Sequence, residues 1–125
     1  MIMEYVALVL SIHESVEAEV VLLIGSVEAK CFISYSPSKI EVGKQYKVEF
    51  EMMLPDKPLV ILSEETTQAI EMMGGGFSCV LSGYLDNDVF RSFVDFYDQD
   101  IHYDYPDLNK QYVKIAVDRI DVSFD

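Results

Sequence analysis

Short segments in which apolar and polar residues alternate constrain the fold of this chain more than any other feature. Residues 45–54 (QYKVEFEMML) show the pattern best, because Tyr46, Val48, Phe50 and Met52 are separated by polar or charged residues. A side-chain period of two is typical of a β-strand that is buried on one face. Further runs with strand character cover residues 3–12, 16–24, 27–35, 59–62, 77–85 and 111–124. In the last of these the apolar face switches near residues 119–120, which predicts a bulge or bend.

Two segments decide how much helix the fold contains. Ser63 is a good N-cap, Glu64 suits the positive end of a helix dipole, and Gly74 follows the apolar residues. We therefore expect one short helix near 64–73. Residues 88–97 fit either an amphipathic helix or a strand. Their β-branched and aromatic composition, and a preceding Asp-Asn-Asp turn, favour a strand.

These elements predict a mainly β fold of about seven strands, arranged as a small barrel or sandwich. An OB-like, partly open barrel is one form of this architecture. The chain has 125 residues, half of them apolar, and contains 15 Phe and Tyr residues. That length and composition argue for a single β-rich domain over residues 1–125 and against disorder.

Cysteine usage and hydropathy indicate the compartment. No segment approaches the roughly 20 apolar residues that span a membrane, and no basic residue precedes the first apolar run. We therefore expect a cytoplasmic protein in which Cys31 and Cys79 are free thiols. Each lies in an apolar strand-like run without a CxxC motif, so we interpret both as small buried hydrophobic residues.

The net charge of −13, from 22 acidic and nine basic residues, excludes several function classes. Proteins that grip nucleic acid or an anionic membrane need a supply of Lys and Arg that this chain lacks. Catalytic motifs are also missing: no G-x-S-x-G occurs, and Gly74-Gly75-Gly76 is not followed by the Lys-Ser/Thr of a P-loop. We expect a non-enzymatic protein without a cofactor.

The acidic residues are concentrated in one part of the chain. Residues 84–107 contain seven Asp, one Arg and seven aromatic residues. Carboxylates attract basic partners, and tyrosine supplies contact area together with a hydroxyl group. The alternative is a solvated face of an acidic protein. If the segment is a binding surface, we expect its contact residues to be Asp95, Asp98, Asp100, His102, Tyr103, Asp104, Tyr105 and Asp107.

A weaker hypothesis for part of this segment is a metal site. On an extended strand, the side chains of Asp98, Asp100, His102 and Asp104 would project to one side and could ligate a divalent cation. The spacing fails the EF-hand pattern, because Tyr103 occupies the position that requires glycine. The other interpretation is a polar strand face turned to water.

The favoured function is therefore a binding module that docks a basic protein partner through an Asp- and Tyr-rich face. One biological form would be an immunity or antitoxin-like protein that covers the basic cleft of a nucleic-acid-acting toxin. The alternatives are a small-molecule or divalent-metal-binding β-barrel and a structural subunit of a homo-oligomer, with a homodimer as the simplest case.

Overall fold

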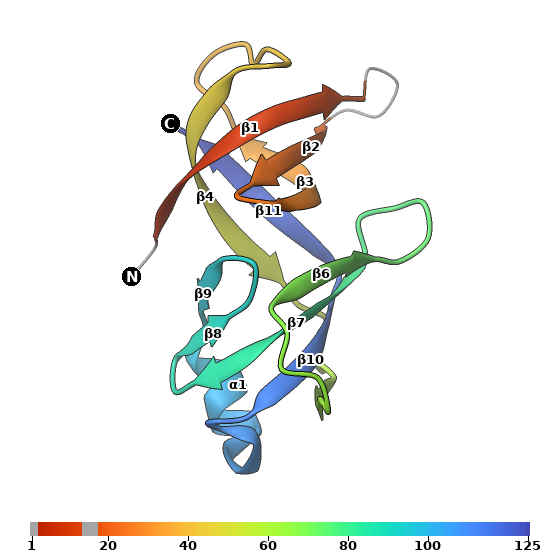
Figure 1. Ribbon diagram of the computed structural model, residues 1–125, viewed down its shortest axis with the longest axis vertical. Helices are drawn as coiled ribbons and strands as arrows, with labels where there is room; N and C mark the ends of the chain where they lie inside the picture. The colour runs from red at the N-terminus through yellow and green to blue at the C-terminus, as the bar shows by residue number, and fades with distance from the viewer. Residues whose placement is uncertain (1–2, 14–17) are drawn as a thin grey trace.

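The structure is a computed structural model that describes residues 3–13 and 18–125. It is mainly β, and its strands form two sheets that lie one above the other (Figure 1). No helix within the described ranges is long and apolar enough to cross a membrane.

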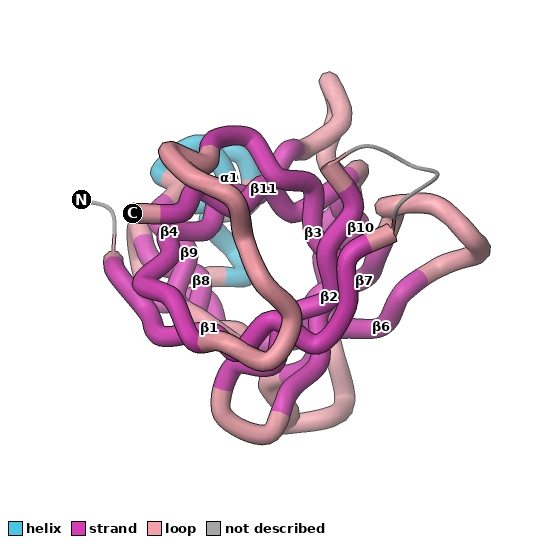
Figure 2. Tube along the Cα trace, turned by 90° about the horizontal axis from the view of Figure 1, so that it is seen from above, coloured by secondary structure: helices cyan, strands magenta, loops and turns pink. Residues whose placement is uncertain are grey.

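The first sheet is a barrel whose strands follow the order β1-β2-β3-β11-β4 and close between β4 and β1. Viewed from above, these strands are arranged in a ring (Figure 2). Strand β4 lies beside β1, which is the Greek-key order of an OB-like barrel. The pairing between β3 and β11 is parallel and short, and its register shifts between Val122 and Ser123. Its strands are β1 (Glu4–Ile12), β2 (Glu19–Ile24), β3 (Val27–Tyr35), β4 (Gln45–Met53) and β11 (Arg119–Phe124).

The second sheet is inserted in the chain between β4 and β11. Its order is β5-β10-β7-β8-β9, and β6 pairs with β7 beside β8. Its strands are β5 (Val60–Leu62), β6 (Ala69–Met72), β7 (Cys79–Asp86), β8 (Val89–Arg91), β9 (Asp95–Tyr97) and β10 (Tyr112–Val117). The predicted bend in 111–124 is confirmed: the chain bends at Asp118, where it leaves the second sheet as β10 and enters the barrel as β11.

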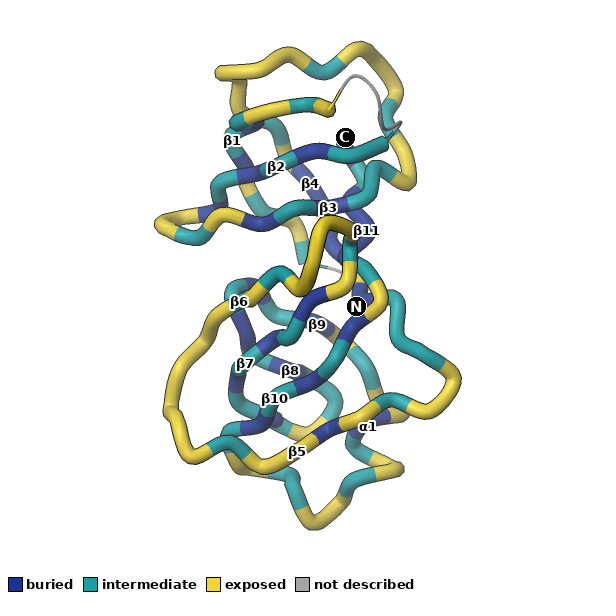
Figure 3. Tube along the Cα trace, turned by 90° about the vertical axis from the view of Figure 1, so that its right-hand side faces the viewer, coloured by how far each residue is buried: buried dark blue, intermediate teal, exposed yellow. Residues whose placement is uncertain are grey.

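The side chains that point to one face of each strand form the core of both sheets. Along β7, buried residues alternate with partly exposed ones over the whole strand, and β2 and β10 follow the same pattern (Figure 3). An aromatic contact joins the two sheets: the centroid of the Phe50 ring, which lies 6.1 Å from that of Tyr5 within the barrel, is 5.9 Å from that of Phe93 in the β8–β9 connection. The mainly β prediction is confirmed, and so is the interpretation of Cys31 and Cys79 as buried free thiols.

The predicted helix near 64–73 is wrong, because the segment contains strand β6 instead. The Ser63 hydroxyl does accept the Glu65 amide at 3.1 Å, but this closes a turn rather than beginning a helix. Ile70 and Met72 then pair with Leu81 and Cys79 of β7. Pairing with β7 satisfies the backbone and packs both apolar side chains against the core, which an exposed helix would not do.

The strand preference for 88–97 is confirmed by β8 and β9, which form a hairpin. Asn87 has a φ of 54°, a left-handed conformation that Asn tolerates in the turn before β8. The helical segments lie later, at α1 (Gln99–Asp104) and the short 3-10 helix η1 (Pro106–Leu108). The described residues therefore contain eleven strands rather than about seven, because the runs 88–97 and 111–124 each form two strands and β6 replaces the predicted helix.

Candidate functional site

Helix α1 occupies the segment where an extended acidic row was expected. Asp98 is its N-cap: the backbone of Asp98 is extended, and Oδ1 accepts the amides of Asp100 at 2.9 Å and Ile101 at 3.2 Å. Ile101 is buried, and its carbonyl accepts the Tyr105 amide at 2.9 Å. The capping carboxylate and the buried isoleucine together explain why the segment becomes a helix.

The expected single-sided row of Asp98, Asp100, His102 and Asp104 is therefore wrong. Residues two apart on a helix point to nearly opposite sides, whereas residues four apart share a side. Asp100 and Asp104 consequently lie on one side, and His102 on another. Within 3–13 and 18–125, no group of three or more His, Cys, Asp or Glu residues is placed to hold a metal ion. The geometry does not favour the metal hypothesis.

The helix instead forms one wall of a cavity of about 270 Å³, which we name the acidic pocket. The opposite wall is the connection between β4 and β5. Four carboxylates line the pocket: Asp56, Asp98, Asp100 and Asp104. Its remaining walls are apolar or aromatic, from Leu54, Pro55, Pro58, Ile101 and Tyr105.

None of the four carboxylates forms an ion pair with another described residue. The one basic residue of the connection 54–59 is Lys57, which is exposed. The Asp98 carboxylate accepts two backbone amides, which hold it in place. The pocket is thus a small concave surface with a net negative charge.

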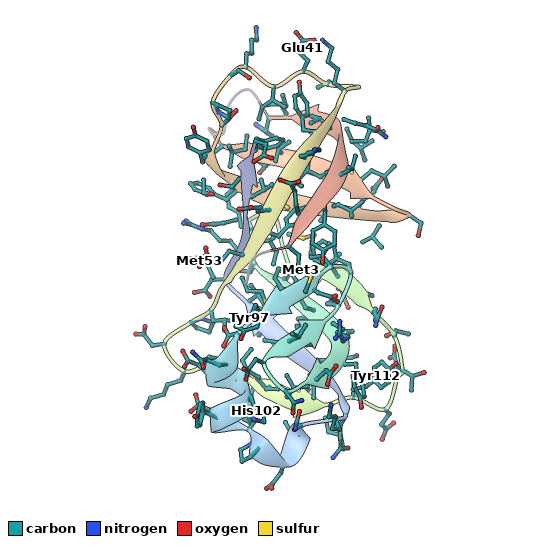
Figure 4. The ribbon with its side chains drawn as sticks, turned by 90° about the vertical axis from the view of Figure 1, so that its left-hand side faces the viewer. Met3, Glu41, Met53, Tyr97, His102 and Tyr112 are labelled. Carbon is teal, nitrogen blue, oxygen red and sulfur yellow. The ribbon has the colours of Figure 1, made fainter. Side chains whose placement is uncertain are left out.

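A second cavity, of about 220 Å³, lies between β4 and β9 and shares Asp98 with the acidic pocket. Met3 and Tyr97 line it, and both lie on the same side of the molecule as His102 (Figure 4). Glu51 and Asp95 are its other carboxylates. Asp95 is paired with Arg91 at 3.0 Å, so its charge is partly neutralised.

Tyr5 of β1 connects strand β9, which lines this second cavity, to the barrel. The Asp95 amide donates to Tyr5 Oη at 2.8 Å, on the edge of β9 that faces away from β8. Burial is the main cause that raises the pKa of the Tyr5 hydroxyl above its ordinary value. Tyr5 therefore remains a neutral hydrogen-bonding group that joins the two sheets.

Basic residues pair with two of the three aspartates in the first part of the acidic segment 84–107. Asp86 forms ion pairs with Lys110 and Arg91, and these partners lower the pKa of its carboxyl, the Lys110 hydrogen bond having the largest effect. Arg91 also binds Asp95. Asp88 and the four aspartates from Asp98 onward form no ion pair among the described residues, so the uncompensated charge of the segment lies mainly in its second half.

The remaining predicted contact residues divide between the pocket and its surroundings. Tyr105 lines the pocket, and its hydroxyl donates to the Pro58 carbonyl at 2.6 Å, which holds α1 against the β4–β5 connection. Tyr103 is 76% exposed and Asp107 is exposed on η1; neither lines the pocket. His102 is half-buried, and its Nδ1 is buried without a hydrogen-bond partner among the described residues.

Sequence reasoning missed Asp56. It lies more than forty positions before the helix, in a proline-flanked turn that carries no signal of a site. Only the folding of the β4–β5 connection onto α1 brings its carboxylate to the pocket. The prolines on either side of Asp56-Lys57 indicate a turn, but they do not indicate what the turn packs against.

The chain matches the family described as uncharacterised conserved protein UCP019853 over residues 3–125, and it belongs to that family. No curated protein and no solved structure matches it.

Proposed function

We propose that this protein is a non-enzymatic binding module that docks a basic protein partner, with the acidic pocket at the centre of the contact. The observation that carries the proposal is the set of four carboxylates in one cavity without an ion pair among the described residues. A cation from a partner would supply the missing counter-charge.

The chemistry of the pocket suits an arginine or lysine side chain. Carboxylates bind a guanidinium through charge-assisted hydrogen bonds, and the apolar walls suit the aliphatic stem of a long basic residue. Arginine fits better than lysine, because its planar group can contact more than one carboxylate and stack on Tyr105. The volume of about 270 Å³ lies just below the usual range for small-molecule sites, which favours a side chain as the occupant.

The net charge of −13 supports the same function at longer range. A strongly acidic protein is steered toward a basic partner, which speeds encounter at low ionic strength. Enzymes that cleave nucleic acid present basic clefts to bind phosphates. Neutralisation of such an enzyme, as in an immunity or antitoxin-like protein, is therefore one form of the proposed function.

The test is partner capture from the native host with two variants that lose the same amount of charge. The pocket variant is Asp56→Asn, Asp100→Asn and Asp104→Asn. The control variant is Glu28→Gln, Glu64→Gln and Asp118→Asn, three exposed positions outside the pocket. Asp98 stays unchanged, so the helix cap is preserved.

We expect the wild type and the control to retain the same basic protein and the pocket variant to lose it. A decrease of about tenfold or more in affinity is expected, since close charged contacts in an interface are worth more than rim charges. Equal retention by the two variants would refute the role of the pocket, and equal loss would show that only overall charge matters.

A further inference from the structure

Strand β5 has an open edge. It pairs with β10 alone, and the hydrogen bonds Ser63 N–H to Tyr112 O (2.9 Å) and Ala116 N–H to Leu59 O (3.3 Å) show which residues face that partner. Because facing and outward residues alternate in an antiparallel pair, the N–H and C=O groups of Val60 and Leu62 point away from β10. No other described strand pairs with them.

The edge is short, since β5 has three residues, but no charge or proline protects it from pairing. Residues 59–62 are Leu-Val-Ile-Leu, without a charge or a proline. Leu59, Ile61 and Leu62 are 59%, 48% and 55% exposed, respectively, although they are large and apolar. The strand is drawn as exposed along most of its length in Figure 3.

An apolar groove of about 280 Å³ lies on the outer face of the sheet and extends from β5 across β10 and β7 to β6. Leu59, Ile61, Met73, Val80 and Ala116 line it, together with the charged residues Glu71 and Lys114. The groove and the acidic pocket are lined by consecutive residues of the chain, since Pro58 lines the pocket and Leu59 lines the groove.

We propose that an extended segment of the basic partner adds to the second sheet as a new strand along β5. Its backbone would bind the outward groups of Val60 and Leu62, its apolar side chains would contact the β5 end of the groove, and an arginine or lysine would enter the acidic pocket. This inference rests on the proposed function and names its binding mode.

Charge selects this occupant over a second copy of the chain. The open edge begins at a pocket with four unpaired carboxylates, and a second copy would bring a further net charge of −13 toward them. A segment that carries arginine or lysine supplies the opposite charge. The apolar groove gives the same segment a surface for its uncharged residues.

The test uses defined probes and the whole chain. The first probe is a short fluorescein-labelled peptide in which valine and threonine alternate and both ends carry arginine. The second has glutamate at both ends, and the third has proline in place of each threonine, so that it cannot form a ladder. Binding is measured by fluorescence anisotropy, and the contact is located by amide NMR shifts.

The decisive variant is Leu62→Pro, which removes an outward N–H and leaves the pairing with β10 intact, since the Leu62 N–H does not face that strand. Leu62→Ala is the matched control, because it shortens the side chain and keeps the N–H. We expect Leu62→Pro to weaken binding of the arginine peptide about tenfold and Leu62→Ala to change it by about twofold or less. We expect the double variant Asp100→Asn, Asp104→Asn to weaken binding of the arginine peptide as well.

Support requires that the arginine peptide binds better than both other peptides and shifts the amides of Val60 and Leu62. The inference is overturned if binding survives Leu62→Pro, if the proline peptide binds equally well, or if no peptide binds at about 1 mM. Sedimentation that shows a dimer disrupted by Leu62→Pro would also overturn it, with a second copy as the occupant. Should strand addition fail while the Asp56, Asp100 and Asp104 variant still loses the captured partner, the proposed function stands without this binding mode.

Discussion

Replacement of Gly83 by alanine is expected to destabilise the fold more than the same change at any other glycine. Gly83 lies in β7, opposite Val113 of β10 and against the end of β8. A Cβ there would lie 2.3 Å from the carbonyl oxygen of Arg91 and 2.9 Å from its carbonyl carbon. At the other five glycines, a Cβ would meet nothing within 4 Å.

The magnitude follows from what must move. The obstacle is backbone, so the end of β8 has to shift, by roughly 1 Å, to restore ordinary contact. That shift disturbs the Arg91 ion pairs with Asp86 and Asp95 and the hydrogen bond from Ser92 Oγ to the Ser82 carbonyl, which is 2.7 Å long. Overpacking costs about 1–3 kcal/mol and a weakened buried hydrogen bond about 1 kcal/mol. We expect the free energy of unfolding to fall by about 3 kcal/mol.

Urea and thermal unfolding, followed by circular dichroism, measure this change. A loss of about 3 kcal/mol corresponds to a decrease in Tm of roughly 10 °C for a chain of this length. Gly75→Ala is the matched control, because its Cβ would occupy open space, and we expect it to stay within about 0.5 kcal/mol of the wild type. If Gly83→Ala also stayed within that range, the close approach of β7 and β8 would not be a constraint and the reasoning would be wrong.

Three further predictions concern single side chains. Tyr5→Phe leaves the Asp95 amide without its acceptor and is expected to lower the free energy of unfolding by about 1–2 kcal/mol in urea titrations, whereas an unchanged midpoint would show that water replaces the hydroxyl. Burial raises the pKa of the Cys79 thiol to about 11 and that of Cys31 further, so we expect both to react with a thiol reagent near pH 8 only after denaturant is added; rapid reaction of the folded protein would contradict this. The hydrogen bond with Asp125 is the main cause that raises the pKa of the exposed Glu4 carboxyl. The stabilisation that protonated Glu4 contributes is therefore fully present below the unfolded pKa and is lost as the pH rises through the folded pKa. Glu4→Gln should remove that part of the pH dependence from melts recorded between about pH 3.5 and 7, and an identical profile would exclude the pair as its source.

Much of the fold could be predicted because a strand period is a local property. The alternation in 45–54 specifies which side chains face the core, and the structure buries Val48, Phe50 and Met52 along β4. The switch of face near 119–120 likewise marks the point where the chain passes from one sheet to the other. These patterns depend only on neighbours along the chain.

The site was predicted only in part, because its geometry depends on non-local contacts. The row from Asp98 to Asp104 has the spacing of a strand face, yet the capping bonds of Asp98 and the burial of Ile101 make it a helix. This change divides the row and leaves His102 outside the pocket. The local pattern was genuine, but a stronger local hydrogen bond and one buried side chain outweighed it.

By itself, then, the sequence determined a mainly β, strongly acidic chain with two buried thiols and an excess of carboxylates late in the chain. The tertiary structure decided that Ala69–Met72 is a strand, that Asp86 and Asp95 are neutralised, and that Asp56 joins the helix at the pocket. The hydrogen bond from Tyr105 to the Pro58 carbonyl shows why: it joins residues 47 positions apart. A periodic pattern specifies the face of each element, whereas the packing of distant segments determines which charges meet.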